Sequence, residues 1–532
     1  MERRDFVRLG LATGVAGISG LAAGAPMQKT TSARYAPDQL LEAGVQRQQQ
    51  AMRAGKLTAQ ALATRYLARI EAVDRAGPRL RSVIELNPDA LEIARERDRE
   101  RKAGKLRGPL HGIPVLLKDN IATGDKMCTT AGSLALDGVR AARDAHLVTR
   151  LRGAGAVILG KTNLSEWANM RSVRSTSGWS ARGGQTRNPY ALDRNTSGSS
   201  SGSAAAMAAS LATLAVGTET DGSIVSPSSS CGIVGIKPTL GLVSRAGIIP
   251  IAHSQDTAGP MTRSVADAAF LLGALAGPDP QDGATAKAPR INYASFLRKD
   301  GLRGKRLGVA RDFFGANDGV NALIESELTL LREQGAILED VTIPNSDKYG
   351  ETELTVLLHE FRPDLEAWLA AYAPHAPVKT MADIIDFNLR NAKREMPYFG
   401  QEHLIAAQSK GGLEARDYVK ALANNRRYAR DKGLEQVLRD RKLDALVAPT
   451  GGPAARIAGG AVLRRQGLER AGADRHGLCL RTGRPAPPHA DLCGAHQGIA
   501  PSAWPPVSPA RTRAPIAGAH ARRDRDRSPD RA

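Results

Sequence analysis

The chain has 532 residues, of which 42% are hydrophobic and 4% aromatic, and it carries a formal net charge of +20. This hydrophobic content allows a large buried interior and excludes a chain that is disordered throughout. Scarce aromatic residues and scattered basic residues argue against a nucleic-acid partner recognised by base stacking. The four cysteines, Cys128, Cys231, Cys479 and Cys493, form no CxxC pair, so neither a zinc site nor a disulfide framework is indicated.

Residues 1–25 are predicted to be a twin-arginine signal peptide. Arg3 and Arg4 precede Phe6 and a weakly apolar, Gly/Ala-rich run, and "AGA" at 23–25 is a candidate cleavage site. The run is too short and too weakly apolar for stable membrane insertion. An ordinary N-terminal helix is the alternative, but the glycines at 10, 14, 17 and 20 disfavour it. We therefore expect the twin-arginine machinery to export the folded protein to the periplasm or the medium.

Hydrophobic periodicity then predicts alternating helices and strands. The expected helices cover 38–54, 58–74 with Thr58 as its cap, 89–104, 203–216, 263–275 and 320–335. The expected strands cover 82–86, 113–119, 155–161, 305–311 and 443–449. Apolar strands that alternate with helices are typical of an α/β fold around a mainly parallel or mixed sheet.

The composition changes beyond about Gly452. Residues 454–532 are rich in Ala, Pro, Arg and Gly, hardly show periodicity, and contain no lysine, since the last lysine is Lys442. A disordered basic tail is one interpretation. The one we prefer is a GC-rich gene read in the wrong frame, and the fold is then incomplete at the C-terminus.

Two familiar motifs are set aside. "GAVILGKT" at 155–162 matches the P-loop pattern, but its four central residues, 156–159, are apolar and predict a strand rather than a phosphate loop. "GSSSG" at 198–202 places Ser200 at the centre of a nucleophile elbow, which must follow a buried strand. The preceding residues have loop composition, and neither His253 nor His359 stands in an arrangement that favours a general base.

A third constellation is more specific. Lys118 ends an apolar strand, Ser199 lies in "TSGSSSG", and Ser223 follows 24 residues later in "GTETDGSIVSP", whose composition is that of an exposed loop. Together these motifs resemble the amidase signature family over about residues 36–453. The similarity is greatest to its bacterial peptide amidases, which share "GTETDGSIV" and have Asp-Gly, here Asp221-Gly222, where most members have Gly-Gly.

The resemblance implies a Ser–cisSer–Lys triad on a central mixed sheet flanked by helices on both faces. Ser223 would be the nucleophile, Ser199 the bridge after a cis peptide bond, and Lys118 the base. Burial would lower the pKa of Lys118 enough for it to accept a proton. The turn of Thr220, Asp221, Gly222 and Ser223 would supply backbone N–H donors to the oxyanion. No metal or organic cofactor is implied.

The expected reaction is hydrolysis of a small-molecule or peptide amide, with the C-terminal amide of peptides as the preferred substrate. A broad-range aliphatic or aryl amidase is an alternative. So is the amidase component of a tRNA-dependent amidotransferase, which the export signal disfavours. A fourth possibility is a non-catalytic product that keeps the motifs without completing the fold.

Overall fold

The computed structural model describes residues 39–457. The predicted signal peptide, 1–25, and residues 458–532 of the predicted tail lie outside the described residues. Within the described part, no helix combines the length and apolar character that crossing a bilayer requires.

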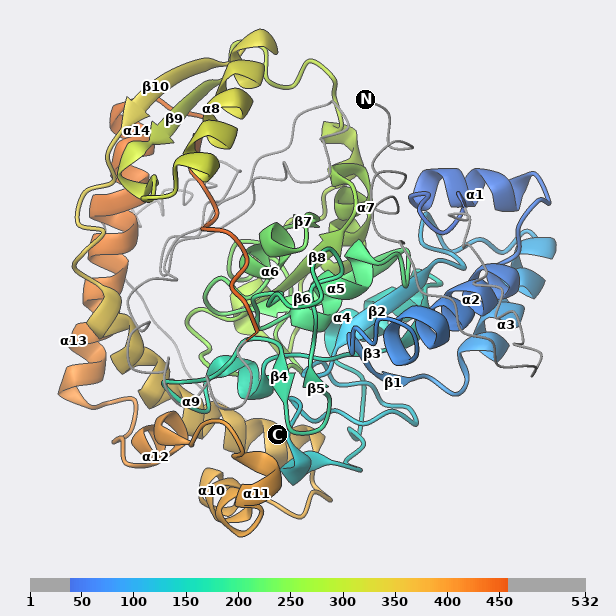
Figure 1. Cartoon of the computed structure of the whole chain (residues 1–532), viewed down its shortest axis with the longest axis horizontal. Helices are drawn as coiled ribbons and strands as arrows, with labels where there is room; N and C mark the ends of the chain where they lie inside the picture. Colours follow the sequence, from blue (N-terminus) through green and yellow to red (C-terminus); the bar gives the residue numbers. More distant parts are fainter. Residues whose placement is uncertain (1–38, 458–532) are drawn as a thin grey trace, which may run out of the picture. The chain divides into compact units, whose positions relative to one another are not determined.

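The described chain alternates helices and strands (Figure 1). The α-helices are α1 (Val45–Arg53), α2 (Ala59–Arg69), α3 (Ala90–Lys102), α4 (His146–Gly153), α5 (Ser201–Ala208), α6 (Val225–Ser230), α7 (Val265–Leu275), α8 (Asp318–Glu333), α9 (Gly350–Tyr372), α10 (Met381–Arg390), α11 (Ala392–Glu395), α12 (Glu402–Gln408), α13 (Arg416–Asn425) and α14 (Glu435–Asp440). The strands are β1 (Val83–Leu86), β2 (Pro114–Lys118), β3 (Val157–Thr162), β4 (Trp179–Ser180), β5 (Gly184–Gln185), β6 (Leu214–Glu219), β7 (Val234–Gly235), β8 (Thr257–Thr262), β9 (Arg306–Ala310), β10 (Ile337–Val341) and β11 (Ala445–Val447). Wider π-helical turns, Ile70–Arg75 and Arg426–Leu434, continue α2 and α13.

The largest sheet has six strands in the order β1-β3-β2-β6-β8-β7. Strands β3, β2 and β6 run parallel in its centre, whereas β1, β8 and β7 pair antiparallel with their neighbours. Every residue of the three central strands is buried, as is usual for parallel strands covered on both faces. The mixed sheet and its helices confirm the predicted α/β class.

A smaller sheet has the order β10-β9-β11, with both pairs parallel. Its strands bury side chains on both faces, because successive residues point to opposite sides. Leu307 and Val309 of β9 pack with α8, whereas Ala310 packs in a second cluster with Leu434 and Val437. The sheet is therefore covered by helical segments on both faces.

Several expected elements are confirmed and three need correction. Thr58 caps α2 by accepting the backbone N–H of Ala61, and the P-loop match contains the buried strand β3. The helix expected over 38–54 is wrong before Val45, because residues 39–44 form turns and coil. The helix expected over 203–216 is wrong beyond Ala208, because Leu214–Glu219 forms β6. The exposed loop expected over 217–227 is wrong at both ends, and none of its residues is exposed. Gly217–Glu219 lie inside β6, where Gly217 packs closely against Met261 and Ser200, and the segment from Val225 belongs to α6.

Candidate active site

Lys118 and Ser199 meet at the end of β2. The apolar strand delivers Lys118 into the interior, where its side chain is fully buried. Its Nζ lies 2.7 Å from Oγ of Ser199, 2.9 Å from Oγ1 of Thr218 and 3.2 Å from the carbonyl oxygen of Thr218. The peptide bond between Gly198 and Ser199 is cis, as the family resemblance predicts. Two of the three predicted catalytic side chains are thus in hydrogen-bonding contact.

Burial lowers the pKa of Lys118 to about 7, against the opposing attraction of Glu219 and Asp256. A neutral amine has two N–H donors and one lone pair. The carbonyl of Thr218 can only accept. The hydroxyls of Ser199 and Thr218 can each donate to the lone pair of Lys118, and that of Ser199 is the nearer of the two.

Ser223 follows β6 in the turn 220–223. Ser223 is buried, with 6% of its surface exposed, whereas Lys118 and Ser199 have none. The backbone N–H of Ser200 donates to the carbonyl of Ser223 at 3.0 Å, which fastens the segment of Ser199 to the turn. The structure thus brings all three predicted residues to one region.

Hydrogen bonds hold the turn 220–223 on its C-terminal side. Gly222 has φ +72°, a conformation that favours glycine. One carboxylate oxygen of Glu219 accepts the backbone N–H groups of Ile224 and Val225 at 2.7 and 3.0 Å. Charge-assisted bonds of this kind fix backbone geometry firmly. Glu219 therefore holds the chain that follows the turn.

Ser200 has a different role from its neighbour Ser199. Its Oγ donates to the carbonyl of Thr218 at 3.0 Å and accepts the N–H of the same residue at 3.2 Å, and it is fully buried. These bonds join the start of α5 to β6. The disfavoured nucleophile elbow gains no support, because the hydroxyl of Ser200 is committed to the backbone of β6.

Two contributors to the site escaped the sequence analysis. Thr218 contacts the amine of Lys118 through both its hydroxyl and its carbonyl, and Asp256 adds a buried carboxylate beside the turn. Burial raises the pKa of Asp256 to about 6. Recognising β6 as a strand that pairs with β2 and β8 would have pointed to both residues.

A second buried lysine lies on the next strand. Lys161 of β3 donates to the carbonyl of Ile121 at 2.7 Å and to Oγ1 of Thr129 at 3.0 Å. Because Leu117 pairs with Lys161 whereas Lys118 pairs with Thr162, the two lysines point to opposite faces of the sheet. Burial lowers the pKa of Lys161, and the attraction of Asp119 opposes that shift.

The described residues contain one group with metal-ligand chemistry, formed by His253, Glu360 and Asp364, whose ligand atoms lie within 4.8 Å of one another. His253 lies more than 100 residues before Glu360 and Asp364 of α9, so the sequence showed no sign of the group. They also bond to one another and to the backbone: Nδ1 of His253 lies 2.9 Å from Asp364, and Glu360 accepts the N–H of Ser254 at 2.9 Å. The hydrogen bond with Asp364 raises the pKa of His253. Ion pairing therefore accounts for the group.

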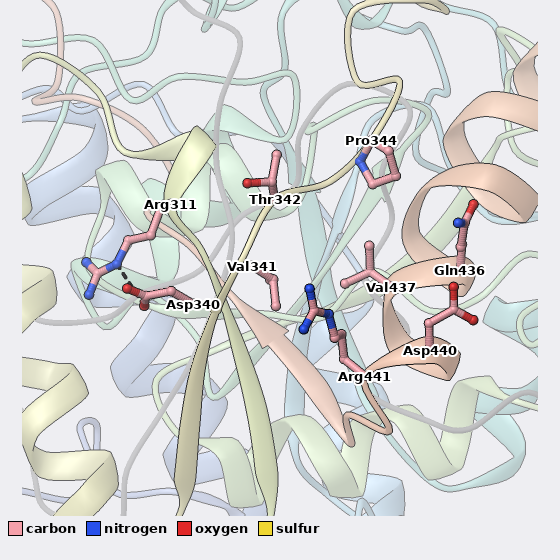
Figure 2. Close-up of a pocket in the computed structure, with 9 residues that line it drawn as sticks. All are labelled: Arg311, Asp340, Val341, Thr342, Pro344, Gln436, Val437, Asp440 and Arg441. Carbon is pink, nitrogen blue, oxygen red and sulfur yellow. Dashed lines mark hydrogen bonds and ion pairs between the residues drawn. The ribbon is translucent and has the colours of Figure 1, made fainter.

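A cavity of about 480 Å³ lies on the smaller sheet (Figure 2). Its lining comes from the end of β10, the residues after it and α14, together with Arg311. Arg311 is paired with Asp340 at 3.0 Å, and Arg441 with Glu339 at 3.3 Å. The cavity includes none of the predicted catalytic residues, and its charges largely neutralise one another.

Comparison with known proteins agrees with the motifs and the fold. The profile of the family named Amidase matches residues 61–462. The chain therefore belongs to the amidase family, whose members include hydrolases of amide C–N bonds, and it is an enzyme of that class.

Individual relatives extend this result. A probable amidase of Arabidopsis thaliana is 46% identical over 404 residues, covering 74% of this chain and 76% of the relative. The structure of a peptide amidase from Stenotrophomonas maltophilia is 54% identical with a TM-score of 0.76, covering 78% of this chain and 85% of that one. One component of the glutamyl-tRNA(Gln) amidotransferase of Chloroflexus aurantiacus is 44% identical over 301 residues, covering 56% of this chain and 60% of the relative.

Proposed function

We propose that the enzyme hydrolyses amides through an acyl-Ser223 intermediate, with Ser199 as the bridge and Lys118 as the base. The contact of 2.7 Å between Nζ of a fully buried Lys118 and Oγ of Ser199 carries this proposal. A lysine in water is protonated at neutral pH and cannot accept a proton. Here burial lowers its pKa to about 7, so that a large fraction is the free amine under ordinary conditions.

In the acylation step, Lys118 takes the proton of Ser199 while Ser199 takes that of Ser223. The oxygen of Ser223 then attacks the amide carbon, and the carbonyl electrons move onto its oxygen. Backbone N–H groups of the turn 220–223 are the donors that we assign to this oxyanion. When the C–N bond breaks, the proton returns through Ser199 to the departing nitrogen, which leaves as ammonia or an amine.

Deacylation repeats the same route with water. Water attacks the acyl carbon as its proton passes through Ser199 to Lys118. The bond between the acyl carbon and Ser223 then breaks, and the proton returns to the oxygen of Ser223. The products are a free acid and a regenerated enzyme, and the balance requires no metal or redox partner.

We propose the C-terminal amide of peptides as the substrate class. The support is the 54% identity to a peptide amidase structure, together with Asp221-Gly222 before the nucleophile, which the bacterial peptide amidases share. The alternative is a broad-range aliphatic or aryl amidase. The amidotransferase interpretation has weaker support, because the relative from Chloroflexus aurantiacus is matched over 60% of its length.

The test is ammonia release from peptide amides and from simple aliphatic and aryl amides. We expect the kcat/KM for a peptide amide to exceed that for acetamide by about 100-fold or more, because remote binding energy lowers the barrier. Ser223→Ala should abolish both activities. Equal kcat/KM values for both substrates would contradict the peptide proposal, and full activity of Ser223→Ala would contradict the nucleophile.

We also propose export through the twin-arginine machinery. Arg3 and Arg4 motivate this proposal, and they lie outside the described residues. Replacing both by lysine should leave the protein in the cytoplasm, as measured by fractionation of expressing cells. Unchanged secretion of that variant would contradict the proposal.

A further inference from the structure

The side chain of Thr220 is tied across the sheet to Asp256. Its Oγ1 donates to Oδ1 of Asp256 at 2.5 Å, and Asp256 is buried. The register of the sheet explains the meeting, because Glu219 at the end of β6 pairs with Thr257 at the start of β8. Thr220 and Asp256 are the next residues beyond that pair. The first residue of the turn 220–223 is therefore fixed from the neighbouring strand.

The second carboxylate oxygen of Asp256 binds the backbone of the loop 251–256, which leads into Asp256. It accepts the backbone N–H groups of Ile251 and Ala252 at 2.8 and 3.0 Å. The backbone N–H of Asp256 in turn donates to the carbonyl of Ala252 at 2.9 Å. The carboxylate thus has one oxygen for the loop 251–256 and the other for Thr220.

Helix α9 anchors this loop through three carboxylates. Asp364 accepts the backbone N–H of His253 at 2.9 Å, and Glu360 accepts that of Ser254 at 2.9 Å. Glu353 accepts the side-chain amide of Gln255 at 2.9 Å. Glu360 and Asp364 follow Glu353 by seven and eleven residues, so all three lie on the same face of the helix. Every residue from 253 to 255 is therefore held by α9.

We infer that Asp256 is a positioning residue for the reaction, which holds the oxyanion-binding turn through Thr220 and is itself held by α9. This inference rests on the proposed function of the turn. Threonine is branched at Cβ and stiff at χ1, so a fixed hydroxyl also fixes the backbone of residue 220. The next peptide bond carries the N–H of Asp221, one of the donors that we assign to the oxyanion.

Donors stabilise an oxyanion when they are already aimed at its position, and losing one donor lowers kcat by about 10²–10³-fold. The bond between Thr220 and Asp256 would therefore affect the transition state more than the binding of substrate. A merely structural role predicts otherwise: cutting the bond would lower stability and leave the kinetics of the folded enzyme unchanged.

The test uses Thr220, since replacing Asp256 would also open the loop 251–256. Thr220→Val keeps the shape and removes the hydroxyl, whereas Thr220→Ser keeps the hydroxyl. Ser244→Ala is the matched control, because it removes a buried hydroxyl–carboxylate bond of the same length, 2.5 Å to Asp279. The measurements are kcat and KM for a peptide amide, the inhibition constant of a peptide aldehyde, and the melting temperature.

We expect Thr220→Val to lower kcat by about 10-fold or more with KM within about threefold, and Thr220→Ser to restore most of the loss. Inhibition by the aldehyde should weaken by a similar factor, because its serine adduct carries an oxyanion. Ser244→Ala should change neither quantity. A kcat of Thr220→Val within twofold of the parent enzyme, or a Thr220→Ser variant as slow as Thr220→Val, would overturn the inference. In either case an inactive Ser223→Ala leaves the proposed function standing, and an active one removes it.

Discussion

Two buried lysines on neighbouring strands of the same sheet, Lys118 and Lys161, have different surroundings, and we expect them to have different roles. Lys118 and Lys161 are both fully buried, and burial lowers the pKa of each. They lie one position out of register on β2 and β3, so their side chains enter opposite faces of the sheet. What differs is the set of groups that each amine meets.

Lys118 meets hydroxyl groups and a carbonyl, with Ser199 able to donate to its lone pair. Lys161 meets the carbonyl of Ile121 and the hydroxyl of Thr129, and Asp119 is the carboxylate that most favours its charged form. Carboxylates act on both amines, Glu219 and Asp256 on Lys118 and Asp119 on Lys161, so the contact with Ser199 is what distinguishes Lys118. Burial alone therefore does not identify a catalytic lysine.

Replacing each lysine by methionine should separate these two roles, and the first replacement has the largest expected effect on activity. Lys118→Met should lower kcat by about 10⁴-fold or more while the protein stays folded, because the base is lost. Lys161→Met should lower the free energy of unfolding by about 1–3 kcal/mol, because the carbonyl of Ile121 and the hydroxyl of Thr129 lose their buried donor. The folded Lys161→Met protein should have a kcat within about tenfold of that of the parent enzyme.

The measurements are ammonia release and urea unfolding for both variants. Lys118→Arg serves as a control, since a guanidinium stays protonated and should also fail. The comparison breaks down if Lys161→Met is inactive at full stability or if Lys118→Met retains substantial kcat.

The pH dependence of kcat/KM should follow the free amine of Lys118. Because burial lowers the pKa of Lys118 from its ordinary value to about 7, the base forms above pH 7 rather than above pH 10. We expect kcat/KM to rise about tenfold per pH unit below pH 7 and to level off above it. A rate that is independent of pH between 5 and 7, or that rises only near pH 10, would be inconsistent with a buried lysine base.

The neighbouring serines Ser199 and Ser200 can be compared in the same way as the two lysines. Ser200→Ala removes two hydrogen bonds to the backbone of Thr218 but no group that we assign to proton transfer. We expect kcat to fall by about tenfold or less. Ser199→Ala, measured beside it, should lose far more. Equal losses in the two variants would restore the nucleophile elbow as a candidate.

The smallest expected effect is that of chelation. His253, Glu360 and Asp364 already bond to one another and to the backbone, so we expect EDTA to leave kcat and the melting temperature unchanged. His253→Gln is the variant to compare with it. Loss of activity in EDTA that zinc restores would show that the group holds a metal.

The joint order of three motifs and their resemblance to the amidase signature family led to the prediction of Lys118, Ser199 and Ser223, since each motif taken alone is ordinary. Sequence could not predict Thr218 or Asp256, because their places depend on which strands pair and in what register. The strand β6 escaped because its apolar run Leu214–Val216 is short and continues the alanine-rich pattern of α5. Local patterns therefore indicated the groups that we propose to react, whereas the groups that hold them in place required the sheet topology.

The most direct test of the central claim is to find the covalent intermediate. Turnover of a peptide ester would be stopped with acid within milliseconds, and the digested protein would be mapped by mass spectrometry. We predict the mass of the acyl group on Ser223 and its absence from the Ser223→Ala variant. An acyl group on Ser200 or another residue, or turnover without any acyl-enzyme in a fully active sample, would contradict the account.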